Sequence, residues 1–363
     1  MSQRLIAACI AVPAVLALLV FASFEKLPFA TYQPGGTIDV LGDSDNQAEI
    51  IQIDGHQVYR DDGQLRMTTV RVSPAAPKGE SGGESLTQLI TTWANGDDAV
   101  YPYSTVHPDD ETPESSQQEG AIQMATSQED AVYVALTEDG IDVPQVLKVA
   151  SVTADSPSDG VLEVDDELLS VDGVDVADDQ ALRTAIQAGT AGQPLQIGIE
   201  RNGVKQTVSV SPTEETVGGE TRLLIGILPG YDYVFPFDVK INISPNIGGP
   251  SAGLIFSLAV YDTITPGSLT GGREVAGTGE ITPDGTVGPI GGIQQKIAGA
   301  RDDGAELFIV PEQNCADALT ADNNAGMRLM MGRTMHEVRV ALEAYAADPN
   351  ADLPSCEDAR SSA

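Results

Sequence analysis

Residues 246–253 are Asn-Ile-Gly-Gly-Pro-Ser-Ala-Gly, and the apolar run Leu-Ile-Phe-Ser-Leu-Ala-Val over 254–260 follows them directly. This order predicts a glycine-rich turn that leads into a buried helix, with Ser251 in the first turn. The free N–H groups at a helix start, and the positive end of the helix dipole, suit an oxyanion. Gly248 and Gly249 lack Cβ atoms, which lets a substrate backbone approach. Taken alone, a serine at a helix start is more often a cap than a nucleophile.

A nucleophilic serine needs a general base, for which the chain offers few residues. The three histidines, His56, His107 and His336, stand in no recognisable motif, so a Ser-His-Asp triad has no support. No metal or other cofactor is expected, because no histidine cluster has metal-ligand spacing. Lys296 is the remaining choice, since a helix over 293–303 would place it on an otherwise apolar face, where burial lowers the pKa of its amine. A lysine that reaches solvent from a core edge is the alternative.

The two stretches together resemble the proteolytic domain of Lon-type serine peptidases, the endopeptidase La family. The matching residues are, in order, Pro250-Ser251-Ala252-Gly253, Thr278-Gly279-Glu280-Ile281, Pro289-Ile290-Gly291-Gly292 and Lys296. The resemblance implies that Ser251 is the nucleophile, that Lys296 is the base and later the acid, and that Thr278 orients the lysine amine. The backbone N–H groups of Ser251 and Ala252 are then the expected oxyanion hole. The implied domain covers 213–345, and the implied activity is that of a serine endopeptidase with a Ser-Lys dyad.

A second resemblance covers residues 122–212, which are similar to a circularly permuted bacterial PDZ domain. It rests on Ala154-Asp-Ser-Pro-Ser-Asp-Gly160, Asp165-Asp-Glu-Leu-Leu169 and Val171-Asp-Gly173, and it departs at Asp165, where the family usually has glycine. PDZ domains bind an extended peptide end as an added strand, so protein or peptide partners are implied. The loop that captures the peptide carboxylate is expected near 143–147. A domain that only packs against its neighbour is the alternative.

The N-terminal segment predicts a membrane anchor. Residues 5–24 contain no charged side chain, and a helix of about 20 apolar residues spans a bilayer. We expect residues 1–26 to be an uncleaved anchor, with the N-terminus in the cytoplasm because Arg4 precedes the run. A cleaved signal peptide is the alternative. The order of segments resembles secreted PDZ-Lon proteases of Gram-positive bacteria, which implies a single-pass protein of the cell membrane with an extracellular catalytic domain. Its expected substrates are exported or membrane-associated proteins.

The remaining segments complete an expected α+β fold made of an N-terminal transmembrane helix, a small β-rich region, a PDZ domain and a Lon-type proteolytic domain. Residues 27–121 are predicted to be the β-rich region, and the acidic run 108–120 within it a solvated loop or a local disordered excursion. Residues 346–363 form a tail. A disulfide between Cys315 and Cys356 is plausible in an oxidising compartment, and two free thiols are the alternative.

Charge and missing motifs limit the functions further. The chain has 54 acidic and 19 basic residues and a formal net charge of −35, which disfavours nucleic-acid binding. Solubility or salt tolerance explains such acidity most simply, and a specific cationic partner is the alternative. The chain has no G-x-x-x-x-G-K-[ST] phosphate loop, so cleavage without ATP is expected. A PDZ adaptor with an inactive protease domain and a structural surface protein are the competing functions. The family allows a homo-oligomer.

Overall fold

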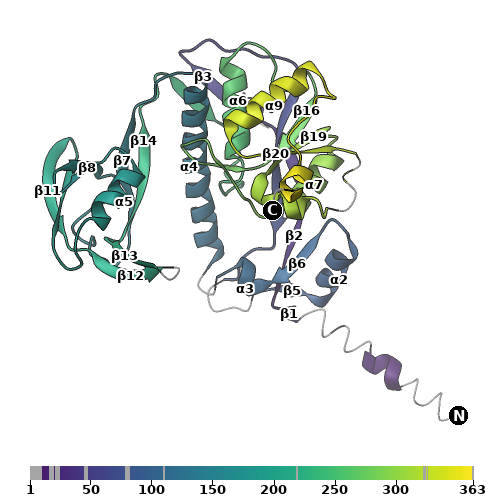
Figure 1. Cartoon of the computed structure of the whole chain (residues 1–363). Helices are drawn as coiled ribbons and strands as arrows, with labels where there is room; N and C mark the ends of the chain where they lie inside the picture. Colours follow the sequence, from purple (N-terminus) through teal and green to yellow (C-terminus); the bar gives the residue numbers. More distant parts are fainter. Residues whose placement is uncertain are drawn as a thin grey trace, which may run out of the picture. The chain divides into compact units, whose positions relative to one another are not determined.

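The chain divides into two compact units, one of which is inserted into the other (Figure 1). The structure is a computed structural model that describes residues 10–15, 20, 25–44, 48–77, 82–108, 111–217, 220–321, 324 and 326–361. The first unit combines Met1–Ile141 with Phe237–Ala363, and the second spans Asp142–Pro236. The first unit is therefore assembled from segments on both sides of the second.

The first unit is built on a mixed six-stranded sheet. Its strands are, in the order in which they lie, β20 (Arg328–Gly332), β19 (Leu307–Pro311), β16 (Glu274–Gly277), β4 (Gln64–Val72), β2 (Phe29–Asp39) and β6 (Ala99–Pro102). β16 is parallel to β4 and β19, and β19 is parallel to β20, whereas β2 is antiparallel to β4 and β6. β19 is buried throughout, as expected of an apolar strand with parallel neighbours on both edges. The segment 27–121 thus supplies strands to the same sheet as 274–332.

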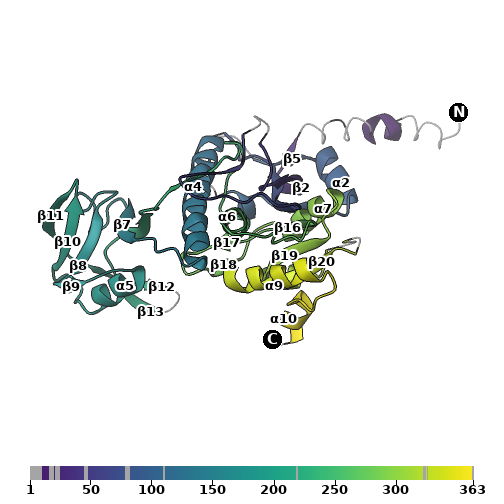
Figure 2. The ribbon, with the colours of Figure 1, turned by 90° about the horizontal axis from the view of Figure 1, so that it is seen from above.

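Helices and short strand pairs surround this sheet. The helices are α2 (Leu86–Ala94), α3 (Tyr103–Val106), α4 (Pro113–Glu138), α6 (Gly253–Ile264), α7 (Ile293–Asp302), α8 (Cys315–Ala318), α9 (Met335–Ala347), α10 (Cys356–Ser361) and the 3-10 helix η1 (Glu312–Asn314). The strand pairs are β1 (Lys26–Leu27) with β5 (Glu84–Ser85), β3 (Ile51–Asp54) with β15 (Asp238–Ile241), and β17 (Glu280–Ile281) with β18 (Val287–Gly288). Figures 1 and 2 both show α4 beside α6. α6 is buried along nearly all of its length, which fits its apolar sequence.

The second unit is a separate sheet with one helix. Its strands lie in the order β11 (Val204–Val210), β10 (Leu195–Arg201), β8 (Glu167–Val171), β7 (Gln145–Val152) and β14 (Ile227–Tyr233); β9 (Val174–Asp175) pairs with β8, and β12 (Thr213–Val217) pairs with β13 (Glu220–Leu224). Leu182 and Ile186 of α5 (Asp179–Gln187) are buried in its core. Asp165 has φ +70°, the left-handed region that glycine favours, so an aspartate keeps a turn that the family makes with glycine.

The predicted transmembrane helix over 5–24 is contradicted, and with it the single-pass membrane localisation with an extracellular catalytic domain. A span needs about 20 consecutive apolar residues in one helix. In the part of the chain that the structure describes, no helix has both the length and the hydropathy for this. Residues 5–9, 16–19 and 21–24 of the segment lie outside that part. The fold class is corrected to a mixed α+β fold without this helix.

The acidic run 108–120, predicted to be a solvated loop, instead contains the start of a long helix. α4 begins at Pro113, and Thr112 caps it: the Ser115 N–H donates to Thr112 Oγ1 at 3.2 Å, and the Thr112 N–H donates to Ser115 Oγ at 2.9 Å. No residue from 113 to 123 is buried. The first half of α4 therefore shows no apolar periodicity, and only its cap signals it in the sequence.

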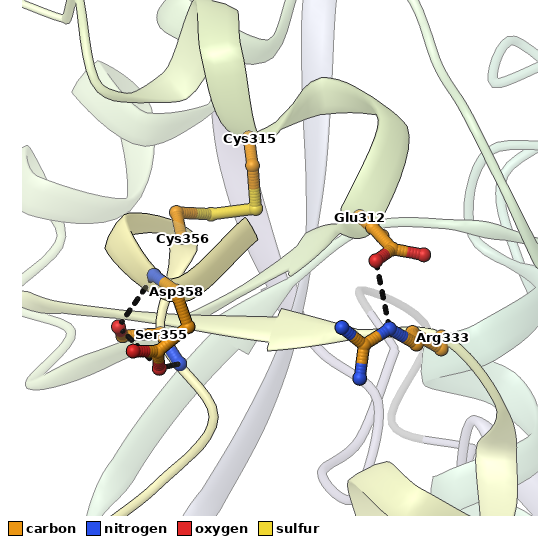
Figure 3. The surroundings of a disulfide bond; sticks show 6 residues. All are labelled: Glu312, Cys315, Arg333, Ser355, Cys356 and Asp358. Atoms are coloured by element: carbon orange, nitrogen blue, oxygen red, sulfur yellow. Dashed lines mark hydrogen bonds and ion pairs between the residues drawn. A yellow bond between two sulfur atoms is a disulfide. The ribbon is translucent and has the colours of Figure 1, made fainter. Parts of the chain in front are cut away.

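A disulfide connects the C-terminal tail to the first unit (Figure 3). Cys315 is the first residue of α8 and Cys356 the first of α10, and both side chains are buried. Their Sγ atoms are 2.06 Å apart, and the bond closes a loop with a sequence separation of 41. Figure 3 also shows the ion pair between Arg333 Nε and Glu312 Oε1, at 2.7 Å, beside this bond.

Replacing both Cys315 and Cys356 by alanine should lower the free energy of unfolding by about 3–4 kcal/mol, because the bond no longer restricts the unfolded chain. Thermal denaturation measured with and without reductant tests this. Reductant should lower the melting temperature of the wild-type protein and leave that of the double variant unchanged. Equal sensitivity of the two proteins to reductant would contradict the expectation.

Candidate active site

Ser251 lies in the turn before α6, whose first residue is Gly253. Gly249 turns the chain with φ +89°. A Cβ atom on Gly253 would lie 2.7 Å from both Ser127 Oγ and Ile281 Cγ2, so glycine lets α6 start close against α4 and β17. Ser127 Oγ in turn donates to the Pro250 carbonyl at 3.0 Å. The turn that carries Ser251 is therefore held from two sides.

Lys296 lies in the first turn of α7, which follows Gly292 in the left-handed conformation with φ +68°. Ile293, Lys296, Ile297 and Ala300 are all buried, which confirms the apolar face predicted for this helix. The lysine is only 2% exposed. It is therefore a core residue and does not reach solvent from the core edge.

The structure brings three of the predicted site residues together. Lys296 Nζ lies 2.7 Å from Ser251 Oγ and 2.9 Å from Thr278 Oγ1. Thr278 follows β16 and is 1% exposed, and its hydroxyl donates to the Ser251 carbonyl at 2.9 Å. Because that hydroxyl hydrogen is used, the Thr278 oxygen is left to accept an N–H of the lysine amine. The Gly279 N–H also donates to the Ser251 carbonyl, at 2.8 Å.

Burial controls the charge of the lysine. It lowers the pKa of Lys296 to about 7, and the nearby carboxylate of Glu280 acts in the opposite direction. Burial also raises the pKa of Glu280, against the influence of Lys296. A large fraction of the amine is therefore uncharged at neutral pH. An uncharged amine that gives one N–H to Thr278 Oγ1 has its lone pair free to accept the hydroxyl proton of Ser251.

Two backbone N–H groups beside Ser251 are available to a ligand. The N–H groups of Gly249, Gly253 and Leu254 donate to carbonyl oxygens at 2.9, 3.2 and 3.1 Å. Those of Ser251 and Ala252 have no acceptor among the residues that the structure describes. They stand at the start of α6, where the helix dipole favours negative charge. These are the two groups expected from the sequence to hold an oxyanion.

A cavity of about 400 Å³ opens on Ser251 and Lys296. The loop 246–248, which the sequence predicted to face a substrate, lines this cavity. Sequence reasoning missed the rest of the wall, which comes from 36–38 of β2, 67–71 of β4 and Met124 of α4. These residues form no local motif, because sheet pairing and helix packing bring them together across the chain. The apolar alternation of β4 was the available signal, and it predicts a strand without its partner.

The histidines are engaged elsewhere. His107 lies 3.0 Å from Glu111 Oε2 and 2.8 Å from the Ser73 carbonyl, His336 lies 2.8 Å from Glu138 Oε1, and His56 stacks on Phe237. Among the described residues, no group of three or more His, Cys, Asp or Glu side chains could hold a metal ion. The described part of the site is thus formed by a serine, a lysine and a threonine.

The second unit has a groove of about 860 Å³. It lies along α5 and the segment 222–229, which includes the end of β13 and the start of β14. It does not include the segment 143–147, where the sequence suggested the carboxylate-binding loop. β14 is an edge strand of its sheet, so its outer side is able to pair with an added strand.

Family comparisons identify both halves of this architecture. Residues 243–343 match the family model of the Lon protease (S16) C-terminal proteolytic domain, and residues 121–211 match that of the PDZ domain. The chain contains a PDZ domain and a Lon-type proteolytic domain. The Lon match begins shortly before Ser251 and ends after Lys296, so it includes all three residues of the site.

Lon proteases are similar to this chain over part of its length. Lon protease 2 of Herpetosiphon aurantiacus is 36% identical over 101 residues, which are 28% of this chain and 12% of the relative. Lon protease of Lachnoclostridium phytofermentans is 38% identical over 112 residues, 30% and 14% of the two chains. Lon protease 2 of Bacillus subtilis is 28% identical over 179 residues, 42% and 31%. The chain spans less than a third of each relative. These matches support a serine endopeptidase.

Two solved PDZ domains are similar to part of this chain. The PDZ domain of an SdrC-like protein from Listeria innocua is 24% identical and covers 23% of this chain and 92% of its own, with a TM-score of 0.21. That of the Listeria monocytogenes protein is 22% identical and covers 23% and 84%, with a TM-score of 0.21.

Proposed function

We propose that the protein is an ATP-independent serine endopeptidase that uses Ser251 and Lys296 as a catalytic dyad. The observation that carries this proposal is the 2.7 Å contact between Ser251 Oγ and the buried Lys296 amine. In the acylation step, Lys296 accepts the hydroxyl proton while Ser251 Oγ bonds to the substrate carbonyl carbon. The N–H groups of Ser251 and Ala252 stabilise the resulting oxyanion. The lysine ammonium then gives its proton to the leaving amine as the C–N bond breaks.

Deacylation repeats these roles with water. The neutral Lys296 amine takes a proton from a water molecule, whose oxygen attacks the ester carbon. The ester bond breaks, and the ammonium returns the proton to Ser251 Oγ. The buried position of the amine favours its uncharged form, which this cycle needs, since burial disfavours the ammonium.

The PDZ domain and the disulfide favour exported proteins with extended segments as substrates. We propose that the groove along α5 and β14 recruits extended segments of substrate proteins by strand addition. The Cys315–Cys356 bond is typical of proteins that fold in an oxidising compartment, which favours exported proteins as substrates. The formation of a homo-oligomer stays a prediction.

The proposal is tested by incubating the purified chain with an unfolded protein, with and without ATP, and with a serine-directed fluorophosphonate. Fragments should appear without nucleotide, and the reagent should block their formation and label Ser251. Cleavage that requires ATP, or a label on another serine with loss of activity, would contradict the proposal. Binding of peptides without any cleavage would favour the PDZ adaptor instead.

Replacing Thr278 by valine should lower kcat by about 10- to 100-fold, because the lysine amine loses the hydrogen bond that orients it. The Gly279 N–H still donates to the Ser251 carbonyl, so the turn itself keeps a support. Steady-state peptide hydrolysis measures the effect. Thr270→Val, at another buried threonine of the same unit, is the control and should keep full activity. A kcat unchanged in Thr278→Val would remove the positioning role.

A further inference from the structure

A second cavity of about 880 Å³ adjoins the cavity at Ser251. Three residues line both of them: Val70 of β4, and Asn246 and Gly248 of the loop before Ser251. The two cavities therefore meet, and a polypeptide chain held at Ser251 is able to continue into the second. We call this second cavity the α4 groove.

Segments far apart in the sequence line the α4 groove. One wall is the first half of α4, and the other is formed by Val70, Val72, Pro74, Ala75 and Val106. The residues of α4 from 113 to 123 bury no side chain in a core, so this half of the helix contributes surface to the groove and little to packing.

Short backbone contacts fix the groove where the two cavities meet. The Gly249 N–H donates to the Gly120 carbonyl of α4 at 2.9 Å. A Cβ atom on Gly248 would lie 3.0 Å from the Gly120 Cα, so the loop and the helix touch through glycines. At the other wall, the His107 ring contacts the Ser73 carbonyl at 2.8 Å, and the Ala76 N–H donates to Tyr103 Oη at 2.6 Å. The groove is therefore preformed.

The charged side chains that line the α4 groove are all acidic. Its charged lining residues are Glu111 and Glu119, and no lysine or arginine is among the described residues that line it. α4 itself contains no basic residue. Glu111 is engaged with His107 at 3.0 Å, which leaves Glu119 as the more accessible carboxylate. Glu119 is exposed and accepts a hydrogen bond from Gln123 Nε2 at 3.1 Å.

We propose that the α4 groove binds the substrate polypeptide beyond the scissile bond and selects segments that carry a lysine or arginine, through Glu119. The proposal rests on the proposed proteolytic function, because it takes the cavity at Ser251 as the place of cleavage. Val70, Val72 and Pro74 offer an apolar floor to an extended chain, and Glu119 offers a carboxylate to a cationic side chain. The same contact disfavours acidic segments by like-charge repulsion.

The test uses the full chain and a series of fluorogenic peptides. Each peptide has otherwise uncharged residues and a single lysine, whose position differs from one peptide to the next. At one distance from the cleaved bond, lysine should raise kcat/KM about three- to tenfold over glutamine, and salt should reduce the gain. Glu119→Gln should abolish it, and Glu119→Lys should turn it into a preference for glutamate. Hydrolysis of a short peptide that fills only the cavity at Ser251 should be unchanged in both variants.

Glu114→Gln is the matched control, because Glu114 is an exposed carboxylate on the same helix that does not line the groove. This variant should keep the lysine preference. Equal preferences in the wild-type protein and in Glu119→Lys, or an equal loss in Glu114→Gln, would overturn the proposal.

Binding separates this proposal from the proteolytic one. In a Ser251→Ala background, fluorescence anisotropy should show tighter binding of the lysine peptide than of the glutamine peptide, and Glu119→Gln should remove the difference. If the wild-type protein cleaves nothing while this binding difference persists, the proteolytic function fails and the groove stands. If cleavage occurs without any dependence on Glu119, the groove proposal fails alone.

Discussion

Ser251→Ala and Lys296→Met should each lower kcat/KM for peptide hydrolysis by roughly 10³-fold or more, since each removes half of the proposed dyad. The double variant should be no less active than the weaker single variant, because a nucleophile without its base, or a base without its nucleophile, leaves the same residual catalysis. Methionine retains the apolar stem of the lysine within the core and removes a buried amine, so the fold should persist.

Hydrolysis of a peptide at saturating and at low concentration, with circular dichroism of each variant, measures these effects. Lys240→Met is the control, because Lys240 is an exposed lysine of the same unit, 3.7 Å from Asp238. It should keep full activity. Effects of the two single variants that multiply in the double variant would show that Ser251 and Lys296 act independently, against the dyad.

The second large effect concerns pH. With the pKa of Lys296 near 7, kcat/KM should rise with pH as the amine loses its proton, reach half of its maximum near pH 7 and then level off. Glu280 holds the pKa of Lys296 up, so Glu280→Gln should move the midpoint of the rise to lower pH. Glu357→Gln, on α10, should leave the midpoint in place. A rate that stays flat from pH 5 to 9 would contradict a lysine base.

The pH dependence of protein stability gives an independent check of the lowered pKa of Lys296. The pKa of Lys296 is lower in the folded protein than in the unfolded chain, so the unfolded chain binds more protons between these two pKa values. The free energy of unfolding of the wild-type protein, relative to Lys296→Met, should therefore increase as pH rises above about 7. Urea denaturation of both proteins across this range measures the difference.

The roles of Ser251, Thr278 and Lys296 were predicted from the resemblance to Lon-type domains, because the local patterns alone favoured a cap and a core-edge lysine. The glycine-rich turn at 246–253 and the apolar face of 293–303 located two of these residues, and the structure places all three in contact. The pairing of β4 with β16 joins Gln64 to Glu274, and no local pattern specifies a partner that distant. Residues 27–121 were therefore predicted to contain strands but not to join the sheet beside Thr278. The predicted domain boundaries stay predictions.

The two wrong predictions, the anchor at 5–24 and the loop at 108–120, have different causes. An apolar run shows that a segment is able to be buried, but it does not show what buries it, and the anchor at 5–24 was inferred from that run alone. The first half of α4, residues 113–123, buries no side chain, so its helical state is signalled by the cap at Thr112 and not by apolar spacing. The unrecognised helix half is also the wall of the α4 groove.

The first unit is formed by segments that precede and follow the PDZ domain in the sequence, so its strands cannot all pair until the PDZ domain has been synthesised. β2 and β4 are translated before the PDZ domain, but β16, the sheet neighbour of β4, and β19, the neighbour of β16, follow only after the whole PDZ domain has been translated. The PDZ domain, whose strands are contiguous, is able to fold while the protease sheet still waits for its partners. Pairing over such separations raises contact order and slows folding. Ser251 and Lys296 meet only after α7 has emerged, so the proposed dyad cannot form on a nascent chain before the PDZ domain has been translated.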